Sequence, residues 1–216
     1  MNGEVRVVDD VTKAFADLVA TEAPPTIALS GGNTARRSYE QLAKRDVDWS
    51  NISVLLGDER WVPVDDPDSN EGMARRALLD QARPRAIHSM RNAGDTQEAA
   101  AQAYDEVVRG IGGVDLVHLG LGPDGHTASL FPGSSALDER ERLVVATGDD
   151  AHPHPRLTLT FPALEMSKLI VFTVAGDGKR EAFARVRAGD DLPAARVHAN
   201  RVIWLVDPAA AGSDAT

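Results

Sequence analysis

The chain has 216 residues, 43% of them hydrophobic and 26% charged, which is typical of one globular domain with a sizeable core. A net charge of −10 argues against a general nucleic-acid surface, and the absence of cysteine excludes disulfides, thiolate zinc sites and cysteine nucleophiles. No apolar run approaches the roughly 20 residues of a membrane span, and residues 1–21 lack the apolar core of a secretion signal. We therefore expect a cytoplasmic protein with no nucleic-acid or membrane partner. As a separate expectation, the protein is a monomer or weak homodimer.

The first part of the chain predicts helix, strand, turn and helix in that order. Apolar residues recur at helical spacing over residues 11–19. The short apolar run Thr26–Leu29 predicts a buried strand, which ends at Ser30-Gly31-Gly32-Asn33-Thr34. A helical pattern then resumes through Tyr39 and Leu42.

The same alternation continues to the end of the chain. We predict strands at residues 52–56, 114–119, 143–147, 156–160, 168–174 and 202–206, and helices at residues 70–79, 96–108 and 178–187. Strands and helices alternating at this spacing favour an α/β fold, a largely parallel sheet covered on both faces. We expect a single domain over residues 1–216, with a tail that frays from about residue 208.

The glycine-rich turn at Ser30-Gly31-Gly32-Asn33-Thr34 is a candidate anion site. Backbone N–H groups and the positive end of the following helix dipole favour a phosphate there. The Ser30 and Thr34 hydroxyls add donors, and Arg36 or Arg37 adds charge. The alternative is a glycine-rich connection that serves tight packing alone.

A second polar turn, Asp58-Glu59-Arg60, follows the strand at residues 52–56. Asp58 or Glu59 could orient a sugar hydroxyl, and Arg60 could bind an anionic oxygen. A solvated loop with an ion pair is the alternative interpretation.

The third turn carries the strongest candidate for chemistry. His126 follows Asp124 by two residues in a glycine-rich turn after the strand at residues 114–119. An imidazole with an unperturbed pKa of about 6.5 can move a proton near neutral pH. A structural histidine is the alternative, and the spacing does not settle whether Asp124 orients the ring or faces the substrate.

Two later cations also lie at strand ends. Arg156 opens the strand at residues 156–160, and Lys179 lies between a strand and a helix. Either could bind phosphate or be a solvated surface charge. His152 and His154 flank a proline in a Pro-rich link, which favours a loop over a metal site.

These segments together resemble the 6-phosphogluconolactonases of the glucosamine-6-phosphate isomerase/6-phosphogluconolactonase superfamily. The resemblance covers nearly the whole chain, and its histidine motif is the most specific. The matching motifs are Ser30-Gly31-Gly32-Asn33-Thr34, Gly57-Asp58-Glu59-Arg60, Asp68-Ser69-Asn70, Gly122-Pro123-Asp124-Gly125-His126-Thr127-Ala128-Ser129-Leu130-Phe131-Pro132, Arg156-Leu157-Thr158 and Gly178-Lys179.

The deaminases of this superfamily share several of these motifs but continue differently after the histidine. Here Ala128-Ser129-Leu130-Phe131-Pro132 and Arg60 have the lactonase form. Two positions depart from the family pattern. Ala35 stands where proline is frequent, and Glu71 stands where an aromatic residue is frequent, which leaves that pocket wall undefined.

The resemblance implies a three-layer, NagB/RpiA-like and Rossmann-like fold, and hydrolysis of 6-phospho-D-glucono-1,5-lactone without cofactor or metal. We expect His126 to be the general base, with Asp124 orienting it. For phosphate we expect the turn at residues 30–34 with Arg156 and Lys179, and Arg36 as a further contributor. Arg60 would bind the phosphate or stabilise the oxyanion. Asp58 would bind a sugar hydroxyl or have a structural role. The alternatives are a glucosamine-6-phosphate deaminase and a non-catalytic sugar-phosphate binder.

Overall fold

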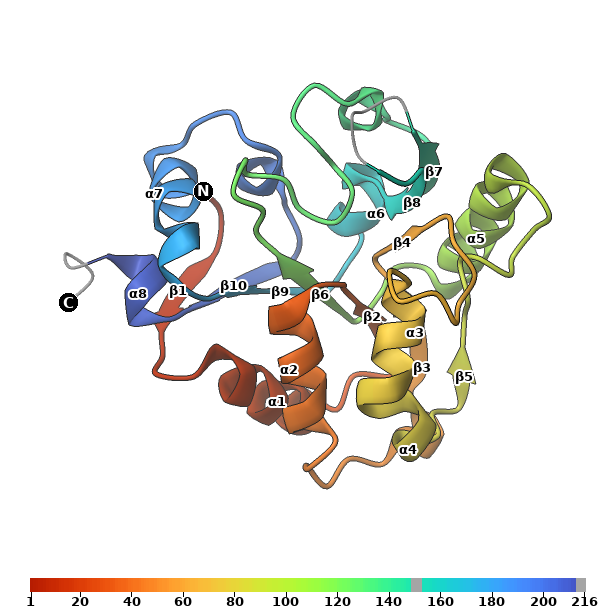
Figure 1. Ribbon diagram of the computed structural model, residues 1–216, viewed down its shortest axis with the longest axis horizontal. Coiled ribbons are helices and arrows are strands. Elements are labelled where there is room, and N and C mark those ends of the chain that lie inside the picture. Colours follow the sequence, from red (N-terminus) through yellow and green to blue (C-terminus); the bar gives the residue numbers. More distant parts are fainter. Residues whose placement is uncertain (149–152, 213–216) are drawn as a thin grey trace.

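A seven-stranded sheet crosses the middle of the molecule (Figure 1) in the computed structural model, which describes residues 1–148 and 153–212. Its neighbouring strands all pair in parallel, in the spatial order β1-β10-β9-β6-β2-β3-β5. The strands are β1 (Glu4–Val7), β2 (Thr26–Leu29), β3 (Ser53–Leu56), β5 (Ala86–Ile87), β6 (Leu116–Gly120), β9 (Leu169–Val174) and β10 (Arg201–Val206). The parallel sheet expected from the sequence is confirmed.

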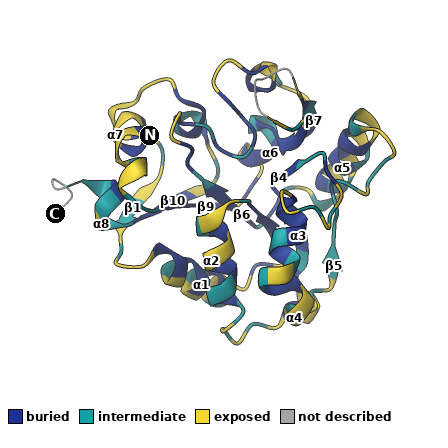
Figure 2. Ribbon diagram, in the orientation of Figure 1, coloured by how far each residue is buried: buried dark blue, intermediate teal, exposed yellow. Residues whose placement is uncertain are grey.

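Helices cover both faces of this sheet. The helices are α1 (Val11–Glu22), α2 (Asn33–Leu42), α3 (Asn70–Ala74), α4 (Asp80–Ala82), α5 (Gln97–Ile111), α6 (Phe161–Glu165), α7 (Arg180–Ala188) and α8 (Pro208–Ala211). In Figure 1, α1 and α2 lie below the sheet, and α6 and α7 lie above it. The helices bury one face against the sheet and expose the other (Figure 2), as amphipathic spacing dictates. The predicted layers are confirmed.

The direction of the chain through the sheet reverses between β2 and β6. From β2 the chain moves to β3 and β5, and from β6 it moves the other way, to β9 and β10. The helices that follow, α2 after β2 and α7 after β9, lie on opposite sides of the sheet (Figure 1). At such a reversal the connecting loops diverge and leave a crevice outside the carboxyl ends of the strands.

A separate antiparallel sheet holds three further strands. β8 (Arg156–Leu159) lies between β4 (Asp58–Arg60) and β7 (Val144–Thr147). The sequence predicts β7 and β8 but not their separate sheet, and it interprets β4 as a turn. The connection between β7 and β8 is too short for the helical crossover that a parallel pair needs, so these two strands pair antiparallel.

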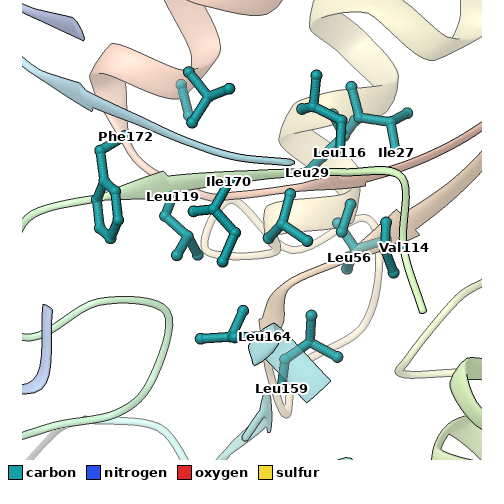
Figure 3. Packing of buried hydrophobic residues seen from close by; sticks show 14 of the residues in the cluster. Ile27, Leu29, Leu56, Val114, Leu116, Leu119, Leu159, Leu164, Ile170 and Phe172 are labelled. Carbon is teal, nitrogen blue, oxygen red and sulfur yellow. The ribbon is translucent and has the colours of Figure 1, made fainter. Parts of the chain in front are cut away.

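The small sheet is attached to the large one through apolar side chains. Figure 3 shows Leu159 of β8 and Leu164 of α6 on the same side of the large sheet as Leu56 and Ile170. All four side chains are fully buried. The core of the large sheet therefore continues into the small sheet and holds β4 and β8 beside the crevice.

The remaining differences from the sequence analysis lie at edges and ends. β1 and β5 are short edge strands that the apolar pattern did not predict. Residues 70–79 begin as α3 and continue as a π-helical turn. The tail expected to fray from about residue 208 begins with α8, because Asp207 caps this helix by accepting from Ala210 N at 2.8 Å and Ala210 is buried. Residues 213–216 of that tail lie outside the described residues. Within the described part of the chain, no helix is long and apolar enough to cross a membrane.

Candidate active site

A cavity of about 350 Å³ lies at the crevice where the strand order reverses. Its floor and sides come from the carboxyl ends of β2, β6 and β9, and β4 and β8 form the opposite wall. Ten of the residues singled out in the sequence line this cavity: Ser30, Gly31, Gly32, Asn33, Thr34, Asp58, Arg60, His126, Arg156 and Lys179. The three polar segments that follow predicted strands in the sequence therefore contribute residues to one cavity.

The glycine turn brings the N-terminus of α2 to the cavity. Gly32 has φ +94°, a conformation that favours glycine, and no side chain of the described residues caps α2. The first amides of a helix have no intrahelical acceptor, so they are available to an anion. Gly31 is required for a second reason, since a Cβ there would lie 2.0 Å from the Asn70 amide oxygen.

A second uncapped N-terminus reaches the cavity after β9. Gly176 has φ +91° and precedes a 3-10 turn, Asp177–Lys179, that leads into α7. Lys179 lines the cavity, and burial lowers its pKa against the opposing effect of Asp124. Two helix starts and a lysine thus give this part of the cavity positive character.

The His126 imidazole lies against the backbone of its own turn. A Cβ on Gly122 would be 2.1 Å from His126 Nδ1, so only glycine leaves room for the ring. Asp124 Oδ1 lies 2.6 Å from Nδ1 and also accepts the His126 backbone N–H at 3.2 Å. The contact between Asp124 and His126, which spacing alone left open, is therefore present, although Asp124 itself does not line the cavity.

The electrostatics of this pair favour a neutral imidazole at neutral pH. Burial lowers the pKa of His126, and Asp124 opposes that shift. Burial also acts to raise the pKa of Asp124, but its contacts with His126 outweigh burial and lower it. An ionised carboxylate on Nδ1 sets that nitrogen as the donor and Nε2 as the basic nitrogen.

The opposite wall carries two arginines and a buried carboxylate. Arg60 and Arg156 are directly opposite in the β4–β8 register, and the charges of both help to lower the pKa of Asp68. Asp58 is 5% exposed, and its carboxylate accepts from Ser129 Oγ at 2.7 Å and from Asn70 Nδ2 at 3.3 Å. These bonds hold Asp58 at the cavity wall.

Glu59 is turned away from the cavity. Its carboxylate accepts from the backbone N–H groups of Arg60, Asn70 and Glu71 and from Ser69 Oγ, at 2.7–3.0 Å. Burial raises the pKa of Glu59 against these bonds. Of the two acids in this segment, Glu59 fixes the start of α3, and only Asp58 reaches the cavity.

Two other positions raised by the sequence lie outside the cavity. Arg36 is on the exposed side of α2, where its Nη1 pairs with Glu40 Oε1 at 2.5 Å. Glu71, which stands where the family frequently has an aromatic residue, is buried and pairs with Arg75 at 2.7 Å. The structure brings neither side chain to the lining residues.

The structure adds lining residues that the sequence did not single out. Asn70 lies between Gly31 and Asp58, and its place in the Asp68-Ser69-Asn70 motif was the available signal. His118 and Thr173 lie at the floor. In the sequence, each is a polar residue within an apolar strand, and the hydrophobic pattern alone does not say whether such a residue is structural or functional.

The described residues hold no group of three His, Cys, Asp or Glu side chains suited to a metal. His154 Nε2 lies 2.9 Å from Asp68 Oδ2, and His152 lies outside the described residues.

Similarity to known proteins extends over the whole cavity. Residues 4–204 match the family described as "Glucosamine-6-phosphate isomerases/6-phosphogluconolactonase". A 6-phosphogluconolactonase of Synechocystis sp. is 42% identical over 91% of this chain and 88% of its own length, and one of Nostoc sp. is 38% identical over 99% of both.

Solved structures show the same similarity. The crystal structure of 6-phosphogluconolactonase from Thermotoga maritima has a TM-score of 0.84 at 29% identity and covers 96% of this chain and 100% of that one. A monomeric glucosamine-6-phosphate deaminase, at 23% identity and a TM-score of 0.82, shares the fold.

Proposed function

The chain belongs to the glucosamine-6-phosphate isomerase/6-phosphogluconolactonase family, and from this premise we propose that its cavity hydrolyses 6-phospho-D-glucono-1,5-lactone to 6-phospho-D-gluconate. The protein is a hydrolase of the 6-phosphogluconolactonase type, and the reaction belongs to the oxidative pentose phosphate pathway. One observation supports this chemistry most directly. A carboxylate-bound imidazole and a cluster of anion-binding groups share one cavity.

His126 is the general base in this proposal. Its Nε2 takes a proton from a water molecule as the water oxygen bonds to C1 of the lactone. The carbonyl oxygen gains negative charge, and the C1–O5 bond then breaks. The imidazolium returns the proton to O5, which becomes the C5 hydroxyl. Asp124 stabilises the imidazolium in between, because its carboxylate lies 2.6 Å from Nδ1.

The phosphate of the substrate binds between the two uncapped helix starts. The amides of residues 31–34 and the positive end of α2 meet its oxygens. Lys179 and Arg156 supply positive charge for the phosphate oxygens. Arg60, on the wall formed by β4 and β8, stabilises the negative charge of the phosphate or of the oxyanion. The Asp58 carboxylate accepts a hydrogen bond from a hydroxyl of the sugar.

The proposal extends to how the protein exists in solution. We expect one domain in the cytoplasm, a monomer or weak homodimer that binds no nucleic acid. The support is the net charge of −10 and the scattering of the large exposed apolar side chains among the described residues: Met1, Val7 and Met166. A single calorimetric transition is the expected result, together with a monomer mass in light scattering at low concentration that rises toward a dimer mass, if at all, only at high concentration.

Decay of the lactone tests the activity. The lactone hydrolyses without enzyme, so its loss is followed with and without protein at mildly acidic pH. Wild-type protein should accelerate the loss and His126→Gln should not. Equal decay with wild type and buffer would refute the assignment. Ammonia released from glucosamine 6-phosphate would favour the deaminase, and sugar-phosphate binding without turnover would favour a sensor.

A further inference from the structure

A buried polar network lies directly beneath the glycine turn. Tyr39 of α2, His118 of β6 and Thr173 of β9 are almost fully buried. Tyr39 Oη is 2.9 Å from His118 Nδ1, and His118 Nε2 is 2.9 Å from Thr173 Oγ1. The His118 ring also stacks on Phe15, with centroids 4.0 Å apart. The network therefore connects β6, β9 and α2, three elements at the border of the cavity.

The same phenol holds both backbone groups of Ser30. Tyr39 Oη accepts the Ser30 N–H at 2.7 Å and donates to the Ser30 carbonyl at 3.0 Å. Ser30 directly follows β2 and is the first of the three residues that connect β2 to the uncapped start of α2. Tyr39 of α2 therefore fixes the first residue of the turn that leads into its own helix.

One proton arrangement satisfies every contact in the network. The single phenol proton goes to the Ser30 carbonyl, so Oη accepts from both Ser30 N–H and His118 Nδ1–H. His118 Nε2 then accepts from the Thr173 hydroxyl. His118 acts as a neutral donor at one nitrogen and acceptor at the other, a pattern that lysine, arginine or a carboxylate cannot supply.

We infer that Tyr39 and His118 are positioning residues for phosphate recognition: they hold Ser30 so that the amides of residues 31–34 are pre-aligned on the phosphate of the substrate. The inference rests on the proposed function and adds a role for two fully buried side chains that act through the backbone of Ser30. The Ser30 N–H is occupied by Tyr39, so the donors offered to the substrate begin at Gly31. Pre-alignment matters because a donor that must reorganise on binding loses affinity.

The chain contains a matched control for this network. Tyr104 of α5 is equally buried and makes the same type of contact on β3, accepting Leu56 N at 2.8 Å and donating to Leu56 O at 3.3 Å. Tyr104 is not among the residues that line the cavity. Removing the Tyr104 hydroxyl therefore measures how much such a contact contributes to stability at a site that does not line the phosphate cavity.

The test compares Tyr39→Phe with Tyr104→Phe in steady-state kinetics on the phosphorylated lactone. Both variants should lower the unfolding temperature, and assays run well below it. Tyr39→Phe should raise KM about tenfold with kcat unchanged, the equivalent of one hydrogen bond to a charged group. Tyr104→Phe should leave KM and kcat at wild-type values. A fall in kcat without a rise in KM, or an equal rise in KM for both variants, would overturn the inference.

Thr173→Val provides a second variant should Tyr39→Phe not fold, because it removes only the far end of the network. It should raise KM in the same direction and by less, and an unchanged KM would count against the inference. Lys179→Met separates the inference from its premise. If Lys179→Met raises KM and Tyr39→Phe does not, only the positioning role fails. If wild-type protein does not hydrolyse the lactone, the proposed function fails.

Discussion

His118 and His126 are eight residues apart on one strand-and-turn unit, yet the fold gives them opposite chemistry. His118 is inside β6, stacked on Phe15 and bonded to Tyr39 and Thr173. His126 is in the turn that follows, 27% exposed, with a carboxylate on Nδ1. Residue type is the same in both cases. The difference lies in burial, since His118 is fully buried at the cavity floor and His126 is partly exposed, and in the charge of the partner.

Burial lowers the pKa of both rings, but only one has an opposing charge. The pKa of His118 falls to about 3, so this ring stays neutral throughout the physiological range. For His126, Asp124 opposes the effect of burial. A histidine that gains and returns a proton needs that opposing carboxylate, because it stabilises the charged form. This contrast predicts different responses to mutation and to pH.

The largest expected effect is on turnover by His126→Gln. Loss of the base should lower kcat by about 10²–10⁴-fold, with little change in the free energy of unfolding, since the ring is partly exposed. His198→Gln, an exposed histidine away from the cavity, is the control and should retain wild-type kcat. A folded His126→Gln protein with near-normal turnover would remove the distinction between the two rings.

Asp124→Asn should have the next largest effect. The amide cannot stabilise the imidazolium, so kcat should fall about 10²-fold. Because Asp124 raises the pKa of His126, its removal should move the acid limb of the kcat/KM profile to lower pH. An acid limb that moves to higher pH, or stays in place, would contradict the assigned pair.

His118 should appear in the pH dependence of stability. Its pKa is about 3 when folded and 6.5 as the usual value, so its contribution is complete above pH 6.5 and is lost as the pH falls toward 3. That loss amounts to about 2 kcal/mol between pH 7.5 and pH 5. Urea unfolding of His118→Gln at both pH values should show a loss smaller by this amount. The exposed His198→Gln should show the wild-type loss.

Lys179→Met should give the smallest effect of the four. It removes the charge and keeps most of the stem, so KM should rise about tenfold with kcat retained. Lys179 also lowers the pKa of His126, so the acid limb should move to higher pH, opposite to Asp124→Asn. Lys168→Met is the control, because Lys168 is exposed and pairs with Asp115 at 2.6 Å. Its KM should not change.

Most of the strands and helices could be predicted from local sequence patterns. Apolar runs gave β2, β3, β6, β9 and β10, because a buried parallel strand is apolar on both faces. The turns after β2 and β6 were visible as glycine and polar residues at strand ends. β1 and β5 were not, because short edge strands carry mixed polarity.

The parts that sequence could not give depend on tertiary contacts. Arg60 and Arg156 are 96 positions apart and meet only through the β4–β8 pairing. Arg36 and Arg156 are both cations near a turn, but the phase of α2 directs Arg36 to Glu40 and away from the cavity. In the sequence, His118 could not be told from an ordinary buried core residue, because its contacts with Tyr39 and Thr173 form only in the folded protein.

The two uncapped helix starts have a consequence for the lifetime of the folded protein. Asp, Ser or Thr side chains cap the first turns of α1, α3, α5, α6 and α8. No side chain of the described residues caps α2 or the 3-10 turn that leads into α7, and both segments contribute residues to the cavity lining. A ligand that completes those turns binds only the native state and stabilises it by mass action, by about 1.4 kcal/mol at tenfold excess over its Kd. Thermal resistance should therefore follow the supply of phosphorylated sugar, and a starved cell should contain the less durable form of this enzyme.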